Sequence, residues 1–284
     1  MRRLPMLTGA FLALTMMLLG TGCSYLKARD RLNKGVAAFR SGKFGDAAEF
    51  FKEAEALDPT WDNPKLYLAT SYLSQWTPGA ASPENLEFLK KAREGFLNVL
   101  ETSPKDETAL ASMATMAYNQ ATTGTFSTLA EKIAKLDEAA EWHRKRIEVN
   151  PKQKEAYYSL AVIEFAKWAP VWLQARAAAK MKTEDPGPIK DAKARAELKA
   201  TYWASLEEAI QNLQKALDID PEYNDAMAYT NLLIRQRADL YDTSDEYKKQ
   251  IEIADGWLQK ALDTAKIKAA RAAKSTGIHA EAPK

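Results

Sequence analysis

Residues 28–61 read ARDRLNKGVAAFRSGKFGDAAEFFKEAEALDPTW. Small residues and one large apolar residue recur in this window at spacings that suit two antiparallel helices joined by a short turn. The positions that carry the pattern are Gly35, Ala47, Phe51, Ala54 and Pro59. Gly35 and Ala47 would let the helices approach closely, and Phe51 would fill the space between them. Pro59 would end the second helix, because proline cannot continue it.

These five positions resemble a tetratricopeptide repeat (TPR). The resemblance implies an all-α chain in which helix pairs stack side by side. A single pair cannot bury its own apolar face, so we expect further copies to follow.

Later segments carry the same positions at wider spacing. The recurring residues are Ala92, Phe96 and Pro104; Ala139 and Pro151; Ala209, Ala216 and Pro221; and Ala254, Leu258 and Ala261. Both helix patterns survive in repeats 2 to 4, so the extra residues must lie between the two helices of each of these repeats; the fifth copy is less regular, with Thr230 and Asn231 at its first-helix positions. The sequence therefore predicts a TPR-like α-solenoid over residues 28–264, with about five helix-turn-helix repeats and insertions inside repeats 2 to 4. The longest insertion lies within 166–204.

The N-terminus has the pattern of an export signal. Arg2 and Arg3 precede an uncharged run that is too short to cross a membrane as a straight helix. The stretch Leu19-Gly20-Thr21-Gly22-Cys23 then resembles a bacterial lipobox, which implies that residues 1–22 are a signal peptide and that Cys23 becomes the lipidated first residue, followed by a linker over 23–27. The alternative is an ordinary secretory signal with Cys23, the single cysteine, as a free thiol. By the same resemblance, Ser24 favours the outer membrane, with the protein facing the periplasm.

The charge is balanced once the signal is removed. Loss of Arg2 and Arg3 from 40 Lys and Arg leaves 38, against 38 Asp and Glu. A chain without a strong overall field gives no reason to expect nucleic acid as a partner. Residues 265–284 are rich in Ala and Lys, and we expect a solvated helix that frays into a disordered tail.

Catalytic chemistry is hard to build from this composition. His143 and His279 are the only histidines, so triads, Cys/His pairs and zinc sites are disfavoured. His143 takes the large-residue position of the third repeat, where we expect it to pack between helices. The Asp185-Pro186-Gly187-Pro188 cluster is interpreted as a turn. We expect no cofactor, no metal and no enzymatic activity.

Two surfaces are candidates for binding a partner. The first helices of TPR-like repeats line a concave face, which in the first repeat should carry Arg29, Asn33, Val36 and Arg40. Trp168 and Trp172 in the longest insertion could form a second platform, since aromatic residues are enriched in interfaces. They could equally be the buried face by which the insertion packs on its own repeats.

The sequence thus favours a lipid-anchored periplasmic scaffold that binds other envelope proteins or peptides, with the membrane contacted through the lipid on Cys23. A component of an outer-membrane β-barrel or pilus secretin assembly machine is the alternative within the binding class. A cell-wall hydrolase or transferase is the alternative from the enzyme class. The oligomeric state and the partner's identity do not follow from the sequence.

Overall fold

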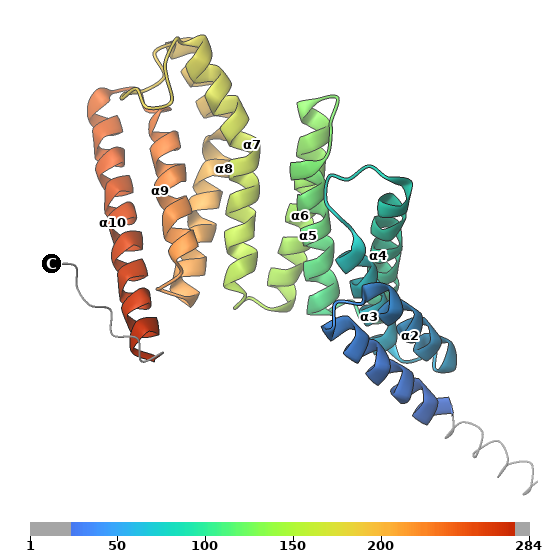
Figure 1. Ribbon diagram of the computed structural model, residues 1–284. Helices are drawn as coiled ribbons and strands as arrows, with labels where there is room; N and C mark the ends of the chain where they lie inside the picture. Colours follow the sequence, from blue (N-terminus) through green and yellow to red (C-terminus); the bar gives the residue numbers. More distant parts are fainter. Residues whose placement is uncertain (1–23, 276–284) are drawn as a thin grey trace, which may run out of the picture. The chain divides into compact units, whose positions relative to one another are not determined.

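The computed structural model describes residues 24–275, which contain helices and no strand (Figure 1). The prediction of an all-α chain is confirmed. Residues 24–40 are helical. They are followed by α2 (Phe44–Leu57), α3 (Asp62–Gln75), α4 (Pro83–Thr102), α5 (Glu107–Thr123), α6 (Leu129–Val149), α7 (Lys154–Ala178), α8 (Ala192–Ile219), α9 (Asn224–Ala238) and α10 (Ser244–Ser275).

Prolines set the ends of four helices. Helices α2, α4, α6 and α8 each end two residues before Pro59, Pro104, Pro151 and Pro221. The intervening residue has left the helical conformation in every case, with φ between −145° and −128° and ψ between 73° and 95°. A residue that precedes proline is driven out of the helical region by its clash with the proline ring, so the recurring proline ends each second helix at the same place.

The chain divides into two compact units between Ser127 and Thr128. Unit 1 contains the helix of residues 24–40 and α2 to α5, with successive helices of α2 to α5 packed together. Unit 2 contains α6 to α10, again with successive helices in contact, and α7 also touches α9.

Small residues permit the close helix packing in unit 1. A Cβ atom on Gly35 would lie 2.4 Å from Cε1 of Phe51, so only glycine fits there. Phe51 is fully buried and stacks on Tyr67 of α3, with 5.3 Å between the ring centroids. Phe51 therefore packs against the first helix of its own repeat and the first helix of the next.

The other repeat positions are also buried. Their exposed fractions run from 0% to 8% over Ala47, Ala54, Ala92, Phe96, Ala139, Ala209, Ala216, Ala254 and Ala261. Leu258 differs, because 42% of it is exposed although it takes the position of Phe51. In the described residues no helix follows α10, so the second surface that would cover Leu258 is missing.

The longest insertion lengthens two helices and adds one loop. Helix α7 has 25 residues and continues through Pro170, and α8 has 28 residues. The loop 179–191 joins them and contains the predicted turn, where Gly187 has a φ of +102°. The insertion thus extends a helix pair of unit 2.

Candidate binding surfaces

In unit 1, the helix of residues 24–40 is the first helix of the first repeat, and we call its side with the predicted binding residues the first-helix face of unit 1. Arg29, Asn33 and Arg40 are exposed on the helix of residues 24–40, and Val36 is half-buried. Their spacing of three and four residues places them along one side of that helix. The sequence predicted this grouping, and the structure brings the four residues together on one face.

The two arginines on this face lack carboxylate partners. Among residues 24–275, no carboxylate lies within ion-pair distance of Arg29 or Arg40. The guanidinium of Arg29 instead lies 4.8 Å from the ring centroid of Tyr25 and 5.9 Å from that of Trp61. These contacts orient Arg29 while they leave its hydrogen-bond donors available for another molecule.

In unit 2, a row of aromatic rings lies on the first helices α7 and α9 and on the residue that precedes α9. The ring centroid of Tyr158 lies 5.2 Å from that of Tyr223 and 5.4 Å from that of Tyr229. Phe165 continues the row at 5.5 Å from Tyr229. All four residues are half-buried and pack against the core of unit 2. We call Tyr158, Phe165, Tyr223 and Tyr229 the aromatic row.

A cation already lies at one end of this row. The Lys154 ammonium lies 2.5 Å from Oδ2 of Asp220 and 4.7 Å from the ring centroid of Tyr223. The hydrogen bond to Asp220 raises the pKa of Lys154, and the same bond lowers the pKa of Asp220. Burial raises the pKa of Tyr223 to about 12, with further contributions from the carboxylates of Glu155, Asp225 and Asp220. Lys154 and Asp220 therefore stabilise each other in their charged forms at this end of the row.

Trp168 and Trp172 lie in the core of unit 2. Trp168 is fully buried and Trp172 is 7% exposed. Nε1 of Trp172 donates to Oδ2 of Asp239 at 2.7 Å. This burial favours packing of the insertion on its own repeats over a docking platform, because neither ring is presented to a partner.

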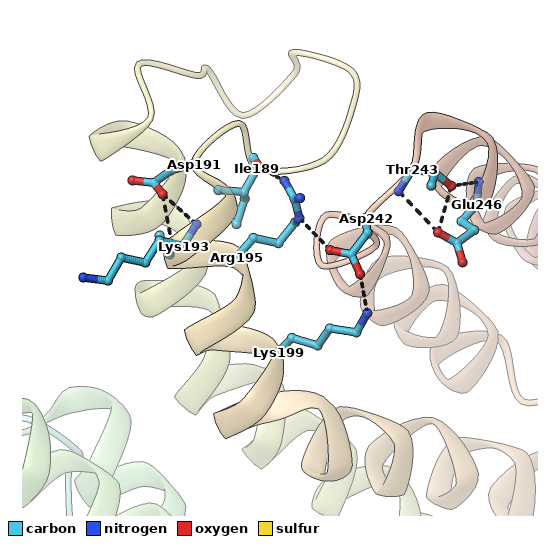
Figure 2. Close-up of polar contacts among 9 residues, drawn as sticks. Ile189, Asp191, Lys193, Arg195, Lys199, Asp242, Thr243 and Glu246 are labelled. Atoms are coloured by element: carbon cyan, nitrogen blue, oxygen red, sulfur yellow. Dashed lines mark hydrogen bonds and ion pairs between the residues drawn. The ribbon is translucent and has the colours of Figure 1, made fainter.

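The insertion loop is bonded to the turn between α9 and α10. The backbone N–H of Ile189, which is fully buried, donates to the carbonyl of Asp239 at 3.0 Å. Figure 2 shows how Arg195 extends this connection: it donates to the carbonyl of Ile189 at 2.7 Å and contacts Asp242 at 3.3 Å. Lys199 reaches the same Asp242 carboxylate at 3.1 Å. The loop is therefore bonded both to the end of α9, through Asp239, and to α8, through Arg195.

A small polar pocket with a volume of about 30 Å³ lies between α6, α7 and α8. Its charged lining residues are Arg144, Glu164, Lys167 and Glu208. Lys167 is already paired with Asp137 at 2.5 Å and with Glu164 at 3.6 Å. The space suits a few water molecules.

The residues considered for catalysis are dispersed. His143 is 6% exposed, and burial lowers its pKa to about 4, with the nearby charge of Arg146 adding to the effect. Its Nδ1 lies 3.1 Å from Nη1 of Arg146, so the imidazole packs in its neutral form. Among residues 24–275 no group of three or more His, Cys, Asp or Glu side chains could hold a metal ion. Cys23 and His279 lie outside the described residues, and no described helix is long and apolar enough to cross a membrane.

Similarity to known proteins is confined to the fold. The structure resembles MamA 41-end from Desulfovibrio magneticus RS-1, with a TM-score of 0.52 and 16% sequence identity over 84% of this chain and 96% of that one. Another crystal structure of MamA gives a TM-score of 0.52 and 14% identity over 90% of this chain and 98% of that one. A thermophilic TPR protein of Thermus thermophilus is also similar, with a TM-score of 0.40 and 17% identity over 73% of this chain and 98% of that one.

The chain has a TPR-like fold. The buried repeat positions and the proline-ended second helices carry this assignment, together with the structural likeness to MamA. No family model and no curated protein matches the sequence.

Several residues that matter for the TPR-like fold were not identified from the sequence. A Cβ atom on Gly95 of α4 would lie 2.7 Å from Cβ of Ala69, so Gly95 is a second position of close helix approach. Arg176 and Asp239 form a buried ion pair. The one signal for that pair was an arginine inside an Ala-rich apolar helix, which gives no hint of its partner far along the chain.

Proposed function

We propose that this TPR-like protein is a lipid-anchored scaffold that binds other proteins in the bacterial cell envelope. The observation that carries the proposal is the first-helix face of unit 1, where Arg29, Asn33 and Arg40 are exposed and the arginines have no carboxylate partner among residues 24–275. Guanidinium and amide groups suit recognition of carboxylates and peptide groups.

The predicted anchor would hold this face near the membrane. Residue 24 is already helical, and Arg29 follows Cys23 so closely that their separation cannot exceed about 20 Å. A lipid on Cys23 would therefore keep a bound partner close to the bilayer surface. The lipobox-like sequence supports export and acylation, and Ser24 supports the outer membrane.

Affinity purification from native membranes tests the proposal. The wild-type protein should retain specific envelope proteins, and the triple variant Asn33→Ala, Val36→Ala, Arg40→Ala should lose them while its helical circular dichroism signal is unchanged. The matched control is Asp46→Ala, Glu49→Ala, Lys52→Ala, which alters three exposed residues of α2 and should leave binding intact.

The identity of the retained proteins separates the alternatives. Recovery of β-barrel assembly or secretin subunits would assign the protein to one of those machines. Failure of the wild type to retain any envelope protein, or loss of binding in the α2 control alone, would overturn the proposal.

A further inference from the structure

The first-helix face of unit 2 forms an apolar stripe that the chain itself leaves partly uncovered. Tyr158, Phe165 and Leu173 lie along one side of α7, because their spacing follows the helical period. Leu173 is 48% exposed, and Leu232 on the adjoining α9 is 38% exposed. From Tyr158 to Leu173, the charged residues of α7 lie on its opposite side, at Glu164 and Lys167.

Carboxylates border one end of this stripe. Glu155 precedes Tyr158 by about one turn on α7, and Asp225 precedes Tyr229 by about one turn on α9. Glu155 is 56% exposed, and its closest cation is Lys154 at 3.9 Å. Asp225 is exposed, and both carboxylates act on the Tyr223 hydroxyl. We call Glu155 and Asp225 the acidic rim.

The nearby cations are occupied within the chain. Lys154 is held by Asp220. On α10, Lys268 donates to the carbonyl of Glu222 at 2.9 Å, and Arg271 pairs with the Glu222 carboxylate at 2.7 Å. Arg235 of α9 pairs with Asp255. The acidic rim is therefore left without a strong ion pair of its own.

Lys154 shows how one cation is held at this end of the face. Its ammonium combines a short ion pair with the ring of Tyr223, and its pKa is raised there. Aromatic faces and carboxylates together favour Lys and Arg side chains over neutral ones.

We propose that this face binds a partner segment in which a Lys or Arg side chain precedes apolar side chains. The cationic group contacts the acidic rim and the aromatic row, and the apolar side chains cover Leu173 and Leu232. The inference rests on the proposed function in one respect, that the protein binds other proteins. It adds a second surface, in unit 2, and the charge of the segment that this surface accepts.

Direct binding measurements test the charge preference. The probe is a short fluorescent peptide of alternating Lys and Leu, compared with the same peptide carrying Glu in place of Lys. The wild-type soluble protein, without residues 1–23, should bind the Lys peptide at least about tenfold more tightly than the Glu peptide, with affinity that falls as salt rises.

Charge-matched variants locate the contact. Glu155→Gln with Asp225→Asn should weaken binding of the Lys peptide about tenfold. Glu197→Gln with Glu208→Gln removes the same charge from exposed positions of α8 and should leave the affinity unchanged. The variant Leu173→Ser with Leu232→Ser should bind the peptide of alternating Lys and Leu more weakly. It should also no longer prefer that peptide to one of alternating Lys and Ser.

Equal affinity for the Lys and Glu peptides would overturn the inference, and so would equal losses in the two charge-matched variants. The unit 1 triple variant could lose the envelope proteins while Glu155→Gln with Asp225→Asn retains them as the wild type does. That result would reject the surface of unit 2 and keep the proposed function. Peptide binding as expected, without retention of any envelope protein, would reject the proposed function and keep the surface.

Discussion

Arg176 and Asp239 form an ion pair in the core of unit 2, with Nη1 of the guanidinium 2.5 Å from Oδ2 and side-chain exposures of 3% and 4%. The same guanidinium donates through Nη2 to the carbonyls of Lys182 and Asp185, both at 2.6 Å. Asp239 also accepts the Trp172 indole N–H. One pair thus joins α7, the insertion loop and the end of α9.

Removal of Asp239 should destabilise unit 2 severely. Asp239→Ala leaves the Arg176 charge buried without a counterion, which costs about 3–5 kcal/mol. Urea denaturation followed by circular dichroism measures the loss. Asp242→Ala is the control, because the Asp242 side chain is 61% exposed, and its midpoint should stay near that of wild type. An Asp239→Ala protein as stable as Asp242→Ala would contradict the role given to the pair.

Trp168 should behave as a core residue. Because its indole is fully buried, Trp168→Ala should cost about 3–5 kcal/mol of unfolding free energy. Leu173→Ala, at an exposed position less than two turns away, should change stability far less. A Trp168→Ala protein with wild-type stability and lost partner binding would instead support the docking-platform alternative.

Two glycines should respond to alanine in opposite directions. Gly35→Ala places a methyl group 2.4 Å from the Phe51 ring, and such overpacking costs about 1–3 kcal/mol. Gly256 lies inside α10, and a Cβ atom added there would meet no other atom within 4 Å, so Gly256→Ala should stabilise by about 0.5–1 kcal/mol. Thermal unfolding of both variants checks this, and a neutral Gly35→Ala would argue against the close approach.

The sequence predicted the repeat positions well because each is imposed by a local rule. A small residue is needed where helices meet, and proline ends a helix wherever it occurs, as at Pro59 and Pro104. Ser82 caps the N-terminus of α4, where its hydroxyl accepts from the backbone N–H of Asn85 at 3.2 Å. Such residues act within a few positions along the chain, so their spacing can be recognised in the sequence.

Contacts between distant segments could not be predicted. Arg176 and Asp239 are joined across a loop whose path depends on both helix lengths. From the sequence alone, Trp168 and Trp172 suit a docking platform and a buried core equally well. Their burial in the structure favours the core. Leu258 takes the position of Phe51 in its repeat, but 42% of it is exposed, because its burial depends on a neighbouring helix and not on the spacing within its own repeat.

His143 should make the stability of the protein depend on pH. Its pKa in the folded protein is lowered from 6.5 to about 4, so the unfolded chain binds the proton more readily. The stabilisation is fully present above about pH 6.5 and is lost as the pH falls toward about 4, with a loss of about 2 kcal/mol by pH 5. Denaturation of wild type and His143→Leu at pH 7.5 and pH 5 isolates this contribution. The variant should lose less stability on acidification, and identical losses would show that His143 is protonated in the folded state.

The anchor prediction concerns Cys23, which lies outside the described residues. If Cys23 is acylated, Cys23→Ser should release the protein from the membrane fraction or leave it as an uncleaved precursor. Radiolabelled palmitate and fractionation measure both outcomes, with Ser24→Ala as the control that keeps the acylation site. Normal cleavage with membrane retention in Cys23→Ser would refute acylation.

Site-specific photo-crosslinking in cells tests most directly whether the first-helix face of unit 1 binds a protein. A photoreactive amino acid at position 33, and separately at position 40, should give discrete adducts with an envelope protein. The same group at position 52, exposed on α2, should give none. Adducts from position 52 with none from positions 33 and 40 would contradict the assignment of this face as the binding surface.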